Sequence, residues 1–369
     1  MTDFTIAELS DSYAFIKRYT DLFRERKEEA SVFQSPEWLS CWLESVKGGA
    51  KLWIVEGVMN DQPFLLGVFG APKRKPASVF SVYSAHLNEV GIPVQDAICV
   101  EYNCFLVTHR ASPDSIEEAL GVILDADLGI DELVLRNALP SLSEAAKKAA
   151  SLRGYGVRCL NTQHTYNIDL SSLRDSDRNF LSAAKPSLRS HIQRSARLYE
   201  SRGDLTLKFA EAEHDRKEAW RLLLQLHADT WKERGELGVF DNGSLKEFHE
   251  RFMRTAPEKT HLITLYSGNE AIGCLYNLVH GRRVYNYQSG FRYESDNRLK
   301  PGLLAHALAA QSYLEKGYVT YDLLAGDAVY KQRLGQRGEK LSSVVIDCAT
   351  GLLADIRKGA RSLKAACVQ

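Results

Sequence analysis

Residues 285–335 read YNYQSGFRYESDNRLKPGLLAHALAAQSYLEKGYVTYDLLAGDAVYKQRLG, and this stretch decides the fold of the second half of the chain. Its pattern predicts a strand, a polar loop, a helix over 303–316 and a second strand over 320–326. Pro301 is typical of the first position of a helix, and Gly317 is typical of the residue that ends one. Strands that alternate with a helix in this way indicate a mixed α/β sheet.

The start of this predicted helix is a candidate anion-binding site. Pro301 and Gly302 follow a polar loop, and the first backbone N–H groups of a helix have no acceptor within it. Those groups and the helix dipole favour a phosphate or pyrophosphate, and Arg298 and Lys300 add positive charge. An ordinary loop-to-helix turn with proline at its first position has the same sequence, so both interpretations stay open.

Composition and charge exclude several classes of protein. The chain of 369 residues has 47 Lys and Arg against 47 Asp and Glu, so it has no formal net charge, which is not typical of a nucleic-acid-binding protein. The hydrophobic content of 44% is typical of a globular protein, and the length favours two or three domains. We find no apolar run long enough for a transmembrane segment and no signal peptide, so we expect a cytoplasmic location.

Cysteine spacing and motif searches narrow the chemistry further. The seven cysteines include no Cys-x-x-Cys pair, which predicts reduced thiols and no metal site. The sequence also has no GxSxG, Walker A or HExxH motif, so common serine hydrolases, P-loop NTPases and zinc proteases are excluded.

The two halves of the chain have similar patterns: a helical start, a hairpin, and then strand, helix and strand. We therefore expect an α/β (α+β) fold of two similar domains, 1–165 and 166–369, each with a mixed central sheet flanked by helices. The pattern also predicts a basic helix over 180–201 and a closing helix over 352–366.

Several strings in order along the chain resemble a known family. They are FQSPEWLSCW (33–42), LRSHIQRSARLYESRG (188–203), LHADTWKERGELGVFD (226–241), YNYQSGF (285–291), KPGLL (300–304) and YDLLAGDAVYKQRLG (321–335). Together they resemble the GNAT acyltransferases, and more specifically the CelD/BcsL-type acetyltransferases associated with cellulose biosynthesis. That branch is related to the FemABX peptidyltransferases, which share a tandem GNAT-like fold.

The resemblance implies an N-acyltransferase that uses acetyl-CoA as its acyl donor and no metal. It implies that the C-terminal domain holds the donor, with Arg298, Lys300, Gly302 and Leu303 at the pyrophosphate. Tyr330 is then the acid that protonates the departing thiolate, and Lys331 supports the reacting carbonyl or a phosphate. Asp322 is either the base or a residue that holds Lys331 in place.

The acceptor residues are predicted less directly. His227 and Trp231 share a helix face with Arg234, and Tyr285 and Tyr287 alternate along a strand beside Gln288. Together with Arg189 on the basic helix, these side chains are candidates for binding an anionic sugar acceptor, free or linked to a nucleotide or lipid. Each has an ordinary alternative, because aromatic residues at such spacings are more often core and the charges more often solvated.

Two other functions stay open: a FemABX-like aminoacyl transferase, and a non-catalytic tandem GNAT scaffold that binds a sugar or a partner. The family points to an amino sugar of an exopolysaccharide precursor, but the residues do not identify the acceptor. In the first half, His86, Asn88, Glu89 and 101–103 are polar residues in apolar surroundings. They are interpreted either as part of a cleft or as a satisfied structural network.

Overall fold

The computed structural model describes residues 2–26, 30–46, 48–73, 82–233, 235 and 238–348. Arg234 and the helix predicted over 352–366 lie outside these residues. The chain divides into two compact units, one formed by residues up to Thr162 and from Lys340 onward, the other by Gln163–Glu339. Most of β13, the last strand, belongs to the first unit, whereas the predicted division placed all residues from 166 onward together.

The first unit is a mixed sheet with helices. Its elements are β1 (Thr2–Glu8), α1 (Ser12–Arg24), η1 (Val32–Gln34), α2 (Pro36–Ser45), β2 (Ala50–Met59), β3 (Gln62–Pro72), β4 (Ser84–Leu87), α3 (Pro93–Asp96), β5 (Leu106–Val107), α4 (Ser115–Asp125), β6 (Glu132–Ala138) and α5 (Pro140–Leu152). The strand order is β1-β2-β3-β4-β6-β13, with β5 beside β3. The β4–β6 pair is parallel and the neighbouring pairs are antiparallel.

The second unit has the same kind of sheet. It contains β7 (Gly156–Asp169), α6 (Leu170–Asp175), α7 (Phe180–Ala183), α8 (Pro186–Glu200), β8 (Leu205–Phe209), α9 (Glu213–Glu233), η2 (Val239–Asp241), α10 (Gly243–Thr255), η3 (Pro257–Lys259), β9 (Thr260–Ser267), β10 (Glu270–His280), β11 (Arg283–Phe291), α11 (Pro301–Glu315), β12 (Thr320–Ala325), α12 (Val329–Leu334) and β13 (Gln336–Asp347). Strands β7 and β13 each have residues in both units. The order is β7-β12-β11-β10-β9-β8, with β11–β12 as the parallel pair.

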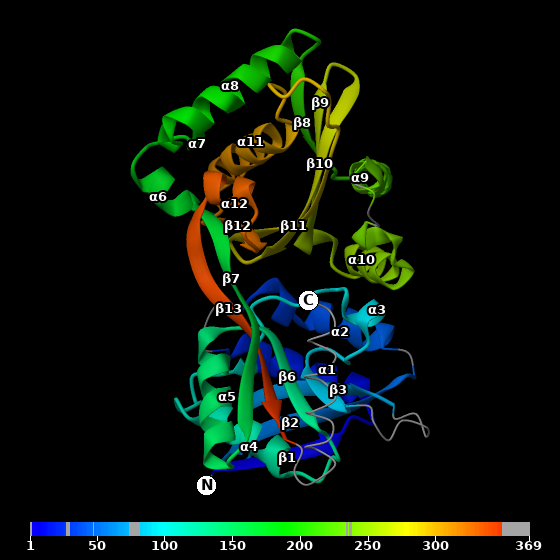
Figure 1. The fold of residues 1–369 in the computed structure, drawn as a ribbon, viewed down its shortest axis with the longest axis vertical. Helices are drawn as coiled ribbons and strands as arrows, with labels where there is room; N and C mark the ends of the chain where they lie inside the picture. The colour runs from blue at the N-terminus through cyan, green and yellow to red at the C-terminus, as the bar shows by residue number, and fades with distance from the viewer. Residues whose placement is uncertain are drawn as a thin grey trace, which may run out of the picture. The chain divides into compact units, whose positions relative to one another are not determined.

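Helices cover both faces of this second sheet. Figure 1 shows α8 and α11 on one face and α9 and α10 on the other. Residues of α8 and α11 share a core cluster with Val284 of β11 and Tyr321 and Leu323 of β12. The fold is therefore the predicted mixed α/β (α+β) arrangement, with an apolar layer between the sheet and α11.

Three local predictions need correction or confirmation. The helix expected over 303–316 is α11, which begins at Pro301, and the strand expected over 320–326 is β12. The single helix predicted over 180–201 is wrong: it is divided into α7 and α8. The division falls before Pro186, since proline disfavours helical geometry in the residue that precedes it.

Candidate active site

The parallel strands β11 and β12 pair over only a short length. Their register joins Arg283 with Thr320, Val284 with Tyr321 and Tyr285 with Asp322. On its other edge β12 pairs with β7 from Thr320 to Ala325, with a bulge after Asp322. β11 meanwhile continues along β10 as far as Phe291. The pairing between β11 and β12 therefore stops at Tyr285 and Asp322, while each strand keeps its other neighbour.

A left-handed residue turns β12 at this point. Leu324 has a φ of 63°, a conformation that side chains larger than glycine adopt rarely and at a cost of about 1–3 kcal/mol. The Oδ1 atom of Asp322 accepts a hydrogen bond of 2.8 Å from the Leu324 N–H. Gly326 follows with a φ of 120°, and α12 begins three residues later at Val329. Asp322 thus stabilises the turn that leads from β12 into α12.

Asp322 also forms an ion pair across the parallel strands. Its Oδ2 atom accepts hydrogen bonds from Arg283, from Nη2 at 2.8 Å and Nε at 3.1 Å. Asp322 is fully buried, whereas the Arg283 side chain is 28% exposed and lies over the Tyr285 ring. Both carboxylate oxygens therefore have donors, which is the environment of a positioning group rather than of a free base.

The N-terminus of α11 begins with Pro301 and is anchored by a hydrogen bond. The Lys300 N–H donates to Oγ of the buried Ser195 at 2.9 Å, which ties the start of α11 to α8. Helix geometry leaves the N–H groups of Gly302 and Leu303 without an intrahelical acceptor. The Leu303 side chain belongs to the core, so only its backbone N–H can contact a donor.

The two charged residues before α11 differ in their partners. Arg298 forms a two-pronged ion pair with Asp296, with Nη2 2.8 Å and Nε 3.0 Å from the carboxylate oxygens. The hydrogen bonds from Arg298 lower the pKa of Asp296 to about 2, so this carboxylate neutralises the guanidinium at all physiological pH values. Lys300 is half-buried at the helix N-cap. Lys300 is therefore the more direct source of positive charge for an anion at this helix end.

Aromatic rings connect the start of α11 with Tyr330. A Cβ atom at Gly302 would lie 3.2 Å from the Phe291 ring, so Phe291 packs directly against the first turn. The Phe291 and His306 rings have centroids 6.0 Å apart, and His306 stacks on Tyr330 at 5.5 Å. Gly302 and His306 are four residues apart and so lie on one face of α11. Rings thus pack in series along this face of α11, from Phe291 at its first turn through His306 to Tyr330.

His306 is a site residue that the sequence interpretation missed. It is 1% exposed, and its Nδ1 atom lies 2.9 Å from the hydroxyl of Tyr321. Burial, with the nearby Lys331 charge, lowers the pKa of His306 to about 3, so the imidazole is neutral at physiological pH. Its spacing of four residues from Gly302 was the available signal, but only the fold brings Tyr330 against it.

Tyr330 lies at the surface with a perturbed hydroxyl. The residue is 37% exposed. Burial of the hydroxyl, with the nearby Tyr293, raises its pKa to about 12. The neighbouring Lys331 donates a hydrogen bond of 2.5 Å from Nζ to the Ala325 carbonyl at the end of β12. Tyr330 and Lys331 therefore both lie at the point where β12 leaves β11.

A cavity of about 300 Å³ lies beside Phe291 and Tyr293. It is also lined by Leu226, Asp229, Thr230, Lys232 and Arg292. Because Phe291 lines the cavity and also contacts the first turn of α11, the cavity lies next to that turn. A larger cavity, of about 570 Å³, lies near Lys316 and Tyr318 at the opposite end of α11, away from the predicted site residues.

Two predicted acceptor residues contact each other. The Trp231 Nε1 atom donates a hydrogen bond of 2.9 Å to Nε2 of His227. His227 is 3% exposed, and its ring packs against Phe240 with centroids 5.1 Å apart. A Cβ atom at Gly238 would lie 2.9 Å from the His227 ring, so a close backbone approach covers it. The ordinary packing alternative thus fits His227 better than contact with a ligand.

The tyrosines of β11 are separated by a bulge. Tyr276 pairs with Gln288 and Asn277 pairs with Asn286, which leaves Tyr287 as the extra residue. Tyr287 contacts His249 of α10 with ring centroids 4.5 Å apart, and both Tyr287 and Gln288 are half-buried.

Tyr285 and Arg189 are held by other contacts. Tyr285 is 2% exposed beneath Arg283. Arg189, at the start of α8, donates to the Ala184 carbonyl at 3.2 Å. These side chains therefore do not form one cluster around Tyr330 through the contacts described, and their role toward an acceptor stays a prediction.

A family comparison covers this site. Residues 186–332 match a family model described as an acetyltransferase (GNAT) domain, and the match extends from α8 to α12. No curated protein sequence matches the chain. Within the described residues, no helix is long and apolar enough to cross a membrane.

Several solved structures have the same fold at low sequence identity. A crystal structure of FemX matches with a TM-score of 0.57 and 10% identity, covering 91% of this chain and 96% of that one. A conserved protein of unknown function from Bacteroides thetaiotaomicron matches with a TM-score of 0.55 and 11% identity, covering 93% and 99%. A tandem GNAT protein from the clavulanic acid biosynthesis pathway matches with a TM-score of 0.50 and 9% identity, covering 95% and 100%. The predicted tandem GNAT-like fold is thereby confirmed.

Proposed function

We propose that this protein is an N-acyltransferase that moves an acyl group from a CoA thioester, acetyl-CoA by default, to an amine. The observation that supports this most is the series of ring contacts that joins the N-terminus of α11, through Phe291 and His306, to Tyr330. A pyrophosphate bound at the N-terminus of α11 would direct the rest of the donor toward Tyr330.

The donor would be held mainly by backbone groups. The N–H groups of Gly302 and Leu303 and the positive end of the α11 dipole favour a pyrophosphate, and Lys300 adds a charge. Arg298 already has Asp296 as its partner, so its contribution to donor binding would be weaker than that of Lys300. The Phe291 ring supplies an apolar surface for the uncharged part of the donor, and the adjoining cavity offers space beside it.

In the chemical step, positive charge develops on the attacking amine nitrogen and negative charge on the departing sulfur. The amine nitrogen attacks the thioester carbonyl carbon, an N–C bond forms, and the C–S bond breaks with its electron pair on sulfur. The amine loses a proton to solvent water, and the sulfur leaves as a thiolate. A hydrogen-bond donor beside the sulfur lowers the barrier for its departure.

Tyr330 is the proposed donor to sulfur. An ordinary thiol has a pKa of about 8.5, below the raised pKa of Tyr330. Full proton transfer from Tyr330 to a thiolate is therefore unfavourable, whereas donation of a hydrogen bond is not. We assign Tyr330 the role of stabilising the thiolate by a hydrogen bond, and proton transfer to sulfur would follow from solvent.

Lys331 and Asp322 would act through the turn at the end of β12. Lys331 binds the Ala325 carbonyl, and Asp322 binds the Leu324 N–H, so both hold the backbone that leads to Tyr330. The Lys331 ammonium also supplies positive charge close to His306. This arrangement supports a positioning role for Asp322 in place of the role of general base.

The acceptor we propose is an amino sugar of an exopolysaccharide precursor, free or carried by a nucleotide or lipid, as the CelD/BcsL-type resemblance implies. Trp231, which is half-buried, offers an indole that can stack on a sugar ring, and Lys232 in the adjoining cavity offers a charge for a phosphate. Arg189, Tyr287 and Gln288 stay candidates for acceptor binding.

The test is a transfer assay with the full chain. We expect release of free CoA thiol from acetyl-CoA with an amino sugar acceptor, and a mass increase of one acetyl group on that acceptor. Acetyl-CoA should also raise the Tm, because a ligand that binds only the folded state stabilises it. A higher Tm with acetyl-CoA, but no release of CoA thiol with any acceptor tested, would favour the non-catalytic scaffold. Transfer from aminoacyl-tRNA but not from acetyl-CoA would favour the FemABX-like alternative.

A further inference from the structure

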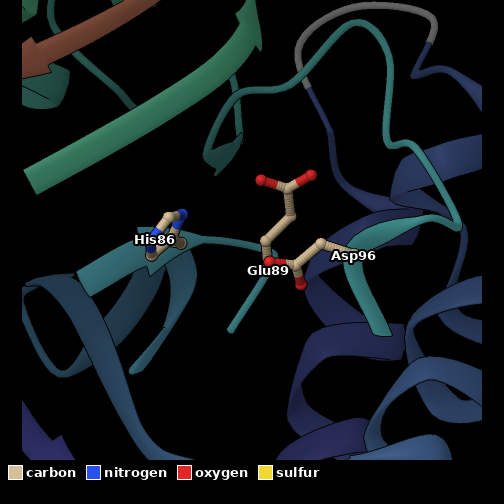
Figure 2. Close-up of side chains that lie close together, drawn as sticks. All are labelled: His86, Glu89 and Asp96. Atoms are coloured by element: carbon tan, nitrogen blue, oxygen red, sulfur yellow. The ribbon is translucent and has the colours of Figure 1, made fainter. Parts of the chain in front are cut away.

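Three metal-ligand side chains gather in the first unit, apart from the residues discussed above. They are His86 on β4, Glu89 just after it, and Asp96 at the end of α3 (Figure 2). One potential ligand atom from each lies within 4.8 Å of the others, and within the described part of the chain this is the one such group found. Short spacing along the chain, with a turn between β4 and α3, brings the three together.

All three side chains are buried, and each has an atom without a hydrogen bond. His86 is 5% exposed, Glu89 3% and Asp96 5%. The atoms without a hydrogen-bond partner are Nδ1 of His86, Oε2 of Glu89 and Oδ2 of Asp96. A buried polar atom left without a partner is destabilising, and here each of the three clustered side chains has one.

The remaining atoms of two of these groups are already held. The His86 Nε2 atom lies 2.9 Å from Oγ of Ser84, and the Asp96 Oδ1 atom accepts a hydrogen bond of 2.9 Å from the Val90 N–H. Metal-binding histidines and carboxylates typically have such outer partners, which fix the orientation of the ligand atom. Gly91 allows the ring to fit, because a Cβ atom there would lie 2.6 Å from His86 Nε2.

The charges in the cluster favour a cation. Two buried carboxyl groups, those of Glu89 and Asp96, lie beside the imidazole of His86, and a bound cation would compensate for carboxylate charge there. The Arg136 Nε atom lies 3.6 Å from Oε2 of Glu89 without a hydrogen bond between them. The Arg136 side chain is 41% exposed, so it can turn into solvent when a metal ion takes its place.

We propose that His86, Glu89 and Asp96 bind a divalent transition-metal ion, with Zn²⁺ as the best match. One imidazole nitrogen and two carboxylate oxygens are ligands that Zn²⁺ accepts, whereas Mg²⁺ prefers oxygen ligands and water. Ligands at 2.0–2.2 Å in a tetrahedral site lie about 3.4 Å from each other, so side-chain rotations of about 1 Å complete the site. A fourth position is left for water or a further ligand.

The proposed site disagrees with our prediction, made from the cysteine spacing, that the protein has no metal site. That prediction used thiol spacing, which has no bearing on a histidine and two carboxylates. The ion would join β4, the following turn and α3, and so would stabilise the first unit whether or not the second unit is an acyltransferase.

The test is Zn²⁺ binding to the full chain after removal of metals with a chelator. Isothermal titration should give one tight Zn²⁺ site, weak or no Mg²⁺ binding, and a higher Tm with Zn²⁺ than without it. Glu89→Gln keeps the shape of the side chain and should lower the Zn²⁺ affinity at least tenfold. His86→Gln should do the same, and His109→Gln at an exposed position of the same unit is the matched control.

The comparison between variants decides the outcome. Equal Zn²⁺ stoichiometry, affinity and Tm increase in the wild type, Glu89→Gln and His109→Gln would overturn the proposal, because the ion would then occupy another site such as an exposed thiol. If His86→Gln does not fold, Glu89→Gln still decides the question. Absence of any Zn²⁺ binding to the wild type would also overturn it.

Discussion

The ring of Tyr330 stacks on the ring of His306, with centroids 5.5 Å apart and planes inclined by 14°. His306 is buried and bound to the Tyr321 hydroxyl, so its ring cannot move freely. A neutral, fixed imidazole therefore sets the orientation of the exposed tyrosine. This contact joins α11, which begins at the proposed donor site, to α12, which follows the turn of β12.

Removal of the Tyr330 hydroxyl should affect turnover far more than folding. Tyr330→Phe keeps the ring on His306 but cannot donate a hydrogen bond to the departing thiolate. We expect kcat to fall about 100-fold, with the Tm nearly unchanged. Steady-state thiol release and thermal unfolding measure the two effects. Tyr13→Phe, at a position that is 83% exposed in the first unit, is the control. An unchanged kcat in Tyr330→Phe would remove this residue from the mechanism.

Lys331 should contribute to the same step through its charge and its hydrogen bond to Ala325. We expect Lys331→Ala to lower kcat about tenfold or more, because the backbone before Tyr330 and the local positive charge both change. Lys331→Arg should recover part of the activity. The exposed neighbour Arg333→Ala is the matched control. Equal kcat in Lys331→Ala and the wild type would contradict the assignment.

The charge at the start of α11 should act on the phosphates of the donor. Lys300→Ala should raise the KM for acetyl-CoA about tenfold, since it removes about 1.4 kcal/mol of charge-assisted binding. The KM for acetyl-pantetheine, which has no pyrophosphate, should hardly change. Lys316→Ala, at the C-terminal end of the same helix, should leave both values unchanged. A similar loss with both donors would place the pyrophosphate elsewhere.

Substitution of Asp322, which forms an ion pair with Arg283, tests whether Asp322 positions the turn or acts as the general base. Asp322→Asn can still accept from Leu324 but loses the charge facing Arg283, so we expect a loss of about 1–3 kcal/mol in the free energy of unfolding. The acidic limb of the pH–rate profile should be retained, with a lower kcat. Disappearance of that limb would instead identify Asp322 as the general base. Arg283→Met should lower stability to a similar extent and retain the limb.

Buried neutral histidines should make the second unit sensitive to acid. Burial lowers the pKa of both His249 and His306 to about 3, against about 6.5 in an unfolded chain. Between pH 6.5 and 3 the unfolded chain binds more protons than the folded one, so stability falls as the pH falls. Each histidine should contribute a loss of about 2 kcal/mol between pH 7.5 and 5.

Urea unfolding at pH 7.5 and pH 5 measures this effect. His249→Gln should lose less stability than the wild type between the two pH values, by about 2 kcal/mol. The exposed His109→Gln should behave as the wild type does. An identical pH dependence in all three proteins would contradict the explanation.

The sequence by itself determined the elements whose signals are local. Pro301 and Gly317 mark the ends of α11, and apolar periodicity marks β12, because these preferences arise within a few residues. The order of the elements and the family strings then predicted the tandem GNAT-like fold and named Tyr330 and Lys331. Local signals failed at Lys185 and Pro186, where the pattern of one helix outweighed the effect of the proline in our interpretation.

Only the tertiary structure decided which side chains meet. The stacking of His306 on Tyr330, the pairing of Asp322 with Arg283 and the left-handed turn at Leu324 depend on which strands are neighbours and where their pairing stops. His86, Glu89 and Asp96 are close in sequence, yet their common burial depends on how β4 and α3 pack. Helix ends and strand periodicity depend on neighbouring residues, so the sequence by itself determined them. Contacts between elements depend on the whole fold, so only the tertiary structure decided them.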